Sequence, residues 1–188
     1  MTPPNRPPNR PPNRPPNRPP QPVSGPVEHP LPTALRSADL LAEAAAQVPE
    51  VMPWDLQALL QQAPPPLVLD VREPAEYTLA HIEGSVHVPR GLLEAACEWD
   101  YDDTVPTLVL ARQRTVVVVC RSGNRSLLAA LQMQRLGYRD VRSLRTGIRG
   151  WNDAEQALVN DTGQPVHADV AEPLLAARVR PDQRSPAR

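Results

Sequence analysis

The 188-residue sequence contains no phenylalanine and only two cysteines. Its hydrophobic core must therefore be built from leucine, valine, isoleucine, alanine and a few larger aromatic residues. Two cysteines are too few for a disulfide-stabilised scaffold, which favours a reducing compartment. No apolar run is long enough to span a membrane, and the start, Met1-Thr-Pro-Pro-Asn-Arg, lacks the apolar centre of a secretory signal. These absences predict a cytoplasmic protein.

An excess of charge is missing as well. Twenty basic residues balance 21 acidic ones, so the formal net charge is -1. This balance offers no bulk electrostatic reason to expect nucleic acid or a membrane surface as a partner. The four histidines and two cysteines show no metal-ligand spacing, so no metal site is predicted. Nothing in the sequence specifies an oligomeric state.

Proline, in contrast, is abundant: there are 26, concentrated toward the N-terminus. Residues 3–18 repeat Pro-Pro-Asn-Arg, and residues 19–32 continue as a linker. Because proline disfavours helix and the repeats hold no apolar residues to bury, residues 1–32 are predicted to be a disordered or polyproline-like extension. A solubilising tail is favoured over a docking peptide for a proline-binding module or a polyanion.

The following residues alternate between helical and strand patterns, which is typical of an α/β domain with a mainly parallel sheet flanked by helices. We expect helices at 37–47, from Pro53 to about 62, from Pro74, and at 91–97, 126–136 and 150–158. Strands are expected at 51–52, 67–71, 87–89, 115–119 and 141–144. The domain is predicted to span 33–165. Residues 166–188 are predicted to be a loose tail, with a short helical stretch at 171–178.

The most informative stretch is 115–130. Four valines run straight into Cys120, and such a run without polar alternation is typical of a strand buried on both faces. A polar loop and then a helix follow. Backbone N–H groups in such a loop, the start of the helix and two arginines all favour an anion there. The pattern therefore predicts a reactive thiolate at Cys120 rather than a cysteine packed as a small hydrophobe. The loop consists of Arg121, Ser122, Gly123, Asn124 and Arg125.

Residues 116–126, Val-Val-Val-Val-Cys-Arg-Ser-Gly-Asn-Arg-Ser, resemble the active-site loop of rhodanese-type sulfurtransferases. Four more segments resemble motifs of that family in the family's order: 69–77, 81–89, 137–144 and 146–151. Together they cover roughly residues 50–166. The resemblance implies a rhodanese-like domain that needs no metal or organic cofactor. It also implies that Cys120 is the catalytic nucleophile and that residues 121–125 bind an anionic substrate.

Supporting roles are predicted as well, and those of Asp70 and His81 follow from the resemblance. Asp70 would brace neighbouring loops, since a carboxylate beside the thiolate would oppose its ionisation, and Arg72 would either orient Asp70 or hold an anionic substrate. His81 would support structure rather than act as a general base. Thr146 stands where the family has the first of two glycines, which predicts a strained or rearranged loop and altered substrate access. Cys97 is interpreted as a bystander rather than a resolving thiol.

The function predicted from this resemblance is sulfur transfer. A sulfane sulfur would pass from thiosulfate or a persulfide donor, through a Cys120 persulfide, to cyanide or a thiol. The partners would be small donors and acceptors, together with a sulfur-relay protein. One alternative is a cysteine phosphatase or arsenate reductase, but those loops place five residues between cysteine and arginine, and here Cys120 and Arg125 are separated by four. A second alternative is a non-catalytic interaction module in which the repeats do the work.

Overall fold

The fold is taken from a computed structural model of the chain, which describes residues 34–177 and 179–184. The Pro-Pro-Asn-Arg repeats and their linker lie outside the described residues. A five-stranded sheet forms the centre, with strand order β1-β5-β4-β2-β3, and every pairing in it is parallel. The predicted parallel α/β sheet is thus confirmed. Its strands are β1 (Glu50–Val51), β2 (Leu67–Asp70), β3 (Val86–His87), β4 (Thr115–Val119) and β5 (Asp140–Leu144).

The central strand is β4, which pairs with β2 on one side and β5 on the other. Its side chains alternate between two hydrophobic cores: Val116 and Val118 lie in one, and Val117 and Val119 lie in the other. All four are buried. The unbroken valine run therefore corresponds to a strand with a hydrophobic layer on each face, as expected for a parallel sheet.

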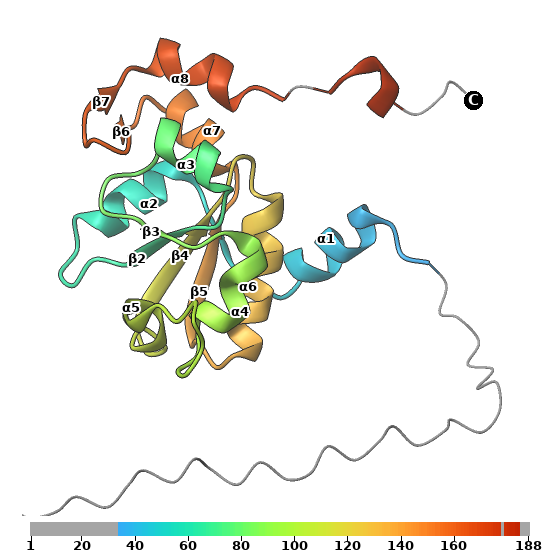
Figure 1. Cartoon of the computed structure of the whole chain (residues 1–188), viewed down its shortest axis with the longest axis vertical. Helices are drawn as coiled ribbons and strands as arrows, with labels where there is room; N and C mark the ends of the chain where they lie inside the picture. Colours follow the sequence, from blue (N-terminus) through green and yellow to red (C-terminus); the bar gives the residue numbers. More distant parts are fainter. Residues whose placement is uncertain (1–33, 178, 185–188) are drawn as a thin grey trace, which may run out of the picture. The chain divides into compact units, whose positions relative to one another are not determined.

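Helices supply both layers (Figure 1). The first core takes residues from α1 (Ser37–Ala45), α4 (Leu93–Ala96), α5 (Pro106–Val109) and α6 (Asn124–Arg135). The second takes residues from α2 (Pro53–Leu60), α7 (Gly147–Asp153) and α8 (Ala168–Leu175). A short helix, α3 (Pro74–Leu79), lies with α7 and α8 near one end of the central strands, while α4 and α5 lie near the other (Figure 1). Single 3-10 turns occur at η1 (Arg90–Leu92) and η2 (Pro181–Gln183).

Helices α6 and α7 begin earlier than expected from the sequence. α6 begins at Asn124 rather than 126, because Gly123, in a left-handed conformation with φ 99°, turns the chain directly into it. α7 begins at Gly147 rather than 150 and ends at Asp153. The residues after it form β6 (Leu158–Val159), which pairs antiparallel with β7 (Pro165–Val166). The hairpin has too few residues for an alternating pattern to be recognisable in the sequence.

The segment after residue 166 also differs from expectation. It contains α8, which spans Ala168–Leu175 rather than 171–178. Ala171 and Leu175 are buried in the second core, and Asn152 of α7 donates a hydrogen bond from Nδ2 to the carbonyl oxygen of Ala168 at 3.1 Å. This helix is thus packed onto α7. None of the helices in the described part of the chain has the length and apolar character needed to cross a membrane.

Candidate active site

Cys120 immediately follows β4, at the carboxyl end of the parallel sheet. In open α/β sheets this is the end where ligands bind. Asp70 closes the neighbouring strand β2, so the two predicted site residues share one edge. The Cys120 side chain is only 1% exposed, and its sulfur accepts a hydrogen bond from the backbone N–H of Gly123 at 3.2 Å. The sulfur therefore lies against the loop, in contact with the N–H of Gly123.

Two glycines allow the loop to pack closely against the segment that follows β5. At Gly123 a Cβ atom would overlap the carbonyl oxygen of Arg145. At Gly147, where φ is 62°, a Cβ atom would overlap the backbone of Cys120 and Arg121. Both positions combine a positive φ with no room for a side chain, so only glycine fits them.

Hydrogen bonds from α7 orient the loop. The N–H of Ile148 donates to the carbonyl oxygen of Cys120 at 2.8 Å, and that of Arg149 donates to the carbonyl oxygen of Arg121 at 3.0 Å. The carbonyls are thereby drawn to α7. Within the described residues, no acceptor pairs with four other backbone N–H groups of the loop, those of Arg121, Ser122, Asn124 and Arg125. Such a run of unpaired N–H groups in the loop that follows Cys120 is suited to hold negative charge.

The two loop arginines have different surroundings. Arg125 forms a two-pronged ion pair with Glu76 of α3, with N–O distances of 2.6 and 2.7 Å. Hydrogen bonding to Glu76 raises the pKa of Arg125 further, so this charge is largely compensated. The side chain of Arg121 has no ion pair or hydrogen bond to any of the described residues. Of the two arginines expected to bind an anion, the geometry therefore leaves Arg121 available.

Asp70 and Arg72 form a buried unit with exposures of 0% and 1%. The carboxylate of Asp70 accepts hydrogen bonds from the backbone N–H of Arg72 and from Nε and an NH2 nitrogen of its guanidinium, at 2.7 to 3.0 Å. The same NH2 nitrogen reaches the carbonyl oxygen of Ala80. Of the two roles left open for Arg72, this geometry supports orienting Asp70 and bracing the end of α3.

His81 is held by its backbone and its ring. Its backbone pairs with Val159 of β6 through N–O distances of 2.8 and 2.9 Å, and its ring stacks on Tyr77 with centroids 3.8 Å apart. Nδ1 lies 2.9 Å from the carbonyl oxygen of Tyr77, so this nitrogen must carry the proton. His87 stacks on Tyr77 as well, at 4.2 Å, and its Nε2 lies 2.9 Å from the carbonyl oxygen of Arg72. These contacts support a structural role for His81.

Sequence reasoning missed two serines at the site. Ser126 Oγ lies 3.4 Å from the sulfur of Cys120 and 2.9 Å from the hydroxyl of Ser143 in β5. Both serines are fully buried. A sequence signal existed for Ser126, which directly follows the loop, but not for Ser143, because β5 also contains the charged residues Asp140 and Arg142. Glu76, Tyr77 and His87 were missed because only the fold brings them to their partners.

Two further expectations concern Thr146 and Cys97. Thr146 has an ordinary φ of -97°, and the positive φ belongs to Gly147, so there is no backbone strain at Thr146. A rearranged loop with altered substrate access stays a prediction. The hydroxyl of Thr146 is buried without a partner among the described residues.

Cys97 is fully buried, and burial raises the pKa of its thiol. It lies near Tyr138 and Arg112, close to the amino end of β4, whereas Cys120 follows the carboxyl end.

A family model described as the rhodanese-like domain matches residues 52–154. The chain belongs to this family. The match includes Asp70, Arg72, His81 and the whole loop that follows β4, and it ends before β6, β7 and α8. No cluster of three histidine, cysteine or acidic side chains suited to a metal ion occurs in the described ranges.

Among curated relatives of this rhodanese-like protein, a putative sulfur carrier protein YrkF of Bacillus subtilis is 34% identical, covering 58% of this chain and 54% of its own. A thiosulfate sulfurtransferase GlpE of Tolumonas auensis is 30% identical over 50% of this chain and 79% of its own. The chain spans about half the length of the first relative and about a quarter (26%) of a probable adenylyltransferase/sulfurtransferase MoeZ of Mycobacterium tuberculosis.

Two solved structures cover 68% of the chain. One is a protein of unknown function from Rhodopseudomonas palustris, titled a possible tyrosine phosphatase, with 27% identity, a TM-score of 0.61 and 97% of its own chain covered. The other is a thiosulfate sulfurtransferase from Pseudomonas aeruginosa, with 28% identity and a TM-score of 0.54, of which 23% is covered. Membership of a sulfurtransferase-type family is thus supported, while the donor and the acceptor are left to the chemistry of the site.

Proposed function

We propose that the protein is a sulfurtransferase that carries a sulfane sulfur as a persulfide on Cys120. The observation that carries this proposal is the position of the Cys120 sulfur within the loop. It receives the N–H of Gly123 at 3.2 Å, and four further loop N–H groups have no acceptor among the described residues. A persulfide places one more anionic sulfur beyond Sγ, and N–H groups directed at that position stabilise its charge.

The reaction consists of two displacements. The Cys120 thiolate attacks the outer sulfur of thiosulfate, an S–S bond forms to Sγ, and the S–S bond of thiosulfate breaks as sulfite leaves with the electron pair. Cyanide or a thiolate then attacks the terminal sulfur and displaces the Cys120 thiolate. Each step exchanges one bond for another, so no oxidant or cofactor is required. Arg121, whose charge is uncompensated, would attract the anionic donor.

The named relatives support this chemistry and extend it to partners. The Tolumonas auensis and Pseudomonas aeruginosa proteins carry the name thiosulfate sulfurtransferase, and the Bacillus subtilis relative is a putative sulfur carrier. A protein acceptor in a sulfur relay is accordingly part of the proposal, beside small-molecule acceptors. The two free thiols favour a reducing, cytoplasmic setting.

The test is the intact mass of the protein after treatment with thiosulfate, beside Cys120→Ser. A gain of one sulfur atom in the wild type, removed by cyanide and absent from the variant, is the expected result. The Cys97→Ser variant serves as the matched control and should gain the sulfur like the wild type. Absence of the adduct from the wild type, with thiosulfate and with an organic persulfide, would overturn the proposal.

Two observations favour competing functions, and further assays on the same purified protein distinguish them from sulfur transfer. The Rhodopseudomonas palustris structure is titled a possible tyrosine phosphatase, so hydrolysis of an aryl phosphate is measured in parallel. The four-residue spacing from Cys120 to Arg125 is one residue shorter than in cysteine phosphatases, which argues against that activity. The 1% exposure of Cys120 favours a non-catalytic module of the same fold. A non-catalytic role would be supported if Cys120 neither took up sulfur nor reacted with an alkylating reagent.

A further inference from the structure

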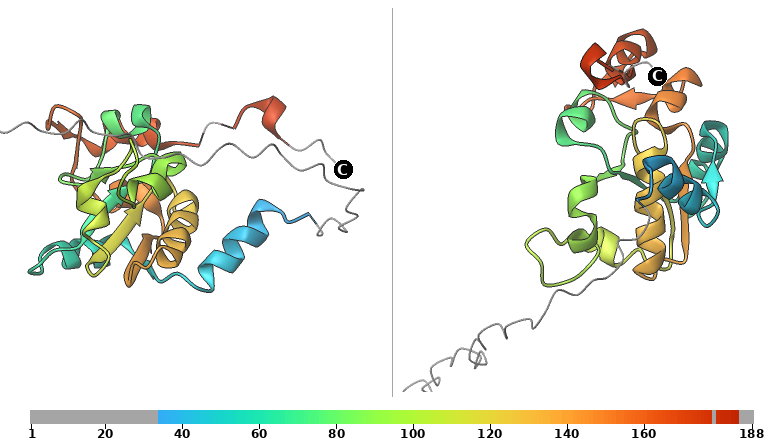
Figure 2. Two further views of the ribbon diagram at one scale, coloured as in Figure 1. Left: turned by 60° about the horizontal axis from the view of Figure 1, so that its bottom comes forward. Right: turned by 90° about the vertical axis from the view of Figure 1, so that its right-hand side faces the viewer.

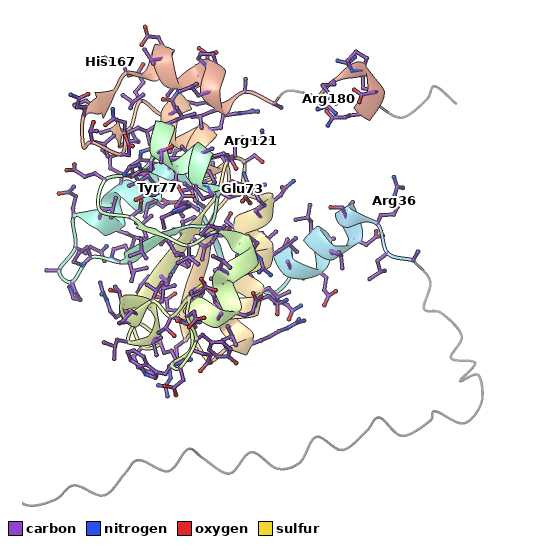
Figure 3. All side chains as sticks on the ribbon, viewed as in Figure 1. Arg36, Glu73, Tyr77, Arg121, His167 and Arg180 are labelled. Carbon is purple, nitrogen blue, oxygen red and sulfur yellow. The ribbon has the colours of Figure 1, made fainter. Side chains whose placement is uncertain are left out.

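A groove of about 560 Å³ lies beside the active-site loop. It opens between α3, the loop and the C-terminal segment, and it is lined by the charged side chains Arg121 and Glu76 and by the apolar Leu79, Leu174, Ala177 and Val179, among others. A smaller cavity of about 130 Å³ adjoins it and shares Glu76, Leu79 and Leu174. Figure 3 shows Arg121 beside α3, whose start is marked by Glu73, on the side of the C-terminal helix.

The apolar wall of the groove is unusual for an exposed surface. Leu79, Leu174 and Val179 are three of the large hydrophobic side chains that the protein exposes, and all three face this one groove. Single exposed apolar residues are ordinary, whereas a gathering of them in a hollow is typical of a ligand site. A groove of this volume lies within the usual range for small-molecule sites, roughly 300 to 1,000 Å³.

Of the two charged side chains that line the groove, only Arg121 has an uncompensated charge. Both carboxylate oxygens of Glu76 are bound by Arg125, so the negative charge of Glu76 is compensated. Arg121 adjoins Cys120 in the chain, and its side chain has no charged partner among the described residues. An anionic group is therefore favoured at Arg121, with an apolar region extending from it toward Leu174.

Thiosulfate alone leaves most of this space empty. It has five non-hydrogen atoms, which at roughly 30 Å³ each would fill about 150 Å³. The C-terminal wall also belongs to this chain rather than to the shared domain, since the family match ends at residue 154 and Leu174 and Val179 follow it. Figure 2 shows from two further directions that α8 lies at the end of the fold where α3 lies.

We propose that the groove is a subsite for the body of an organic sulfur donor. The donor would carry an anionic, transferable sulfur against Arg121 and the loop, and an apolar body at least as large as an aromatic ring between Leu79 and Leu174. Organic persulfides and thiosulfonates have this chemistry. With a thiosulfonate, the Cys120 thiolate attacks the outer sulfur, the bond between the two sulfurs of the donor breaks, and a sulfinate leaves with the electron pair. This inference rests on the proposed sulfurtransferase function.

The test compares two donors with the same reacting group, methanethiosulfonate and toluenethiosulfonate, with cyanide as acceptor and thiocyanate as the measured product. In the wild-type full chain the KM for toluenethiosulfonate is expected to be at least tenfold lower, because even one methylene in an apolar pocket is worth roughly tenfold or more. Equal KM values for the two donors would overturn the subsite.

Leu174→Asp tests the position of the apolar body. It should raise the KM for toluenethiosulfonate about tenfold and change that for methanethiosulfonate less than twofold. The matched control is Val170→Asp, on the same helix, which is also exposed but does not line the groove and should change neither value. Leu79→Asn, on the opposite wall, should reproduce the effect of Leu174→Asp. Equal effects of Leu174→Asp on both donors would contradict the inference.

Sulfonates, which are unreactive analogues of the thiosulfonate donors, test the subsite even if Cys120 does not transfer sulfur. If Cys120 takes sulfur from no donor, the proposed function fails, and the subsite is then judged by calorimetric binding of toluenesulfonate and methanesulfonate. Tighter binding of toluenesulfonate that Leu174→Asp abolishes would support the subsite without the activity. Equal affinity for the two sulfonates would reject it.

Discussion

The hydroxyl oxygens of Ser126 and Ser143 lie 2.9 Å apart in the protein interior, and that of Ser126 lies 3.4 Å from the sulfur of Cys120. Ser126 Oγ also lies 2.9 Å from the carbonyl oxygen of Gly123. A hydroxyl has one proton to donate, so Ser126 can donate either to that carbonyl or, when the sulfur is a thiolate, to Sγ. Ser143 can donate to Ser126 in both cases. The Ser126 hydroxyl can thus change its hydrogen-bond acceptor when the sulfur ionises, and neither buried hydroxyl oxygen is left unpaired.

We expect Ser126→Ala to slow sulfur loading of Cys120 from thiosulfate about tenfold at neutral pH. A hydrogen bond to a charged group contributes roughly 1.5 to 3 kcal/mol, and 1.4 kcal/mol corresponds to a factor of ten. Ser143→Ala acts only through Ser126 and should slow loading less. The rates are followed by rapid quenching and intact mass, with thermal unfolding as the check on folding. Loading of Ser126→Ala at the wild-type rate would exclude this role.

The tripeptide Asp-Val-Arg occurs twice, and the two copies should differ in their contribution to stability. Asp70 and Arg72 are fully buried, whereas the paired side chains of Asp140 and Arg142 are 39% and 32% exposed. Removing one partner of a buried pair leaves an unpaired buried charge. We therefore expect Arg72→Leu to lower the free energy of unfolding by about 3 to 5 kcal/mol.

Arg142→Leu is the matched control for Arg72→Leu. It should lower the free energy of unfolding by at most about 1 kcal/mol, because the ion pair of Arg142 is partly exposed. Both variants are measured by urea unfolding at neutral pH. Similar losses for the two variants would show that burial does not set the difference.

The ion pair of Glu76 and Arg125 should contribute to stability in a pH-dependent way. Burial alone would raise the pKa of Glu76, but the hydrogen bonds and the charge of Arg125 outweigh it, and the pKa is lowered from 4.5. A lowered carboxyl pKa stabilises the fold above about pH 4.5, and this contribution is lost as the pH falls through the folded-state value. Glu76→Gln should therefore be about 0.5 to 1 kcal/mol less stable than wild type at pH 7.

At a pH below the folded-state pKa of Glu76 the difference between Glu76→Gln and wild type should vanish, because the carboxyl group is then protonated in both states. Unfolding curves recorded from pH 7 down to pH 2.5 provide the comparison. Glu94→Gln, which removes an exposed partner of Arg90, is the control for a surface pair. A Glu76→Gln deficit that persisted unchanged at pH 2.5 would count against the charge as its cause.

Cys97 should take no part in sulfur transfer. It is fully buried, and burial raises the pKa of its thiol, so both access and thiolate formation are suppressed. Cys97→Ser should load and release sulfur at the wild-type rate. Mass spectrometry of peptides after brief treatment with iodoacetamide should find Cys97 unmodified in the native protein and modified in urea. A disulfide between Cys97 and Cys120 after mild oxidation would contradict this prediction.

Local patterns along the chain were sufficient to predict the parallel sheet and to single out Cys120 as the candidate nucleophile. Four consecutive valines predict a doubly buried strand, because a parallel strand needs an apolar side chain on each face. The polar loop that follows, with a glycine and two arginines, predicts an anion-binding turn at Cys120. Both inferences depend on residues adjacent in the chain, where backbone geometry alone fixes the neighbours. The bounds of the C-terminal helix were harder to predict, because α8 is stabilised by burying Ala171 and Leu175 against residues far away in the sequence.

The electrostatics and the shape of the site depended on contacts between distant residues. Arg121 and Arg125 are equivalent in the sequence, yet Glu76, 49 residues before Arg125, compensates one charge and leaves the other available. Ser126 meets Ser143 only because β5 pairs beside β4. The groove exists because α3 and the C-terminal segment converge on the loop. Side-chain pairing of this kind has no period along the chain, so it follows only from the way the elements pack.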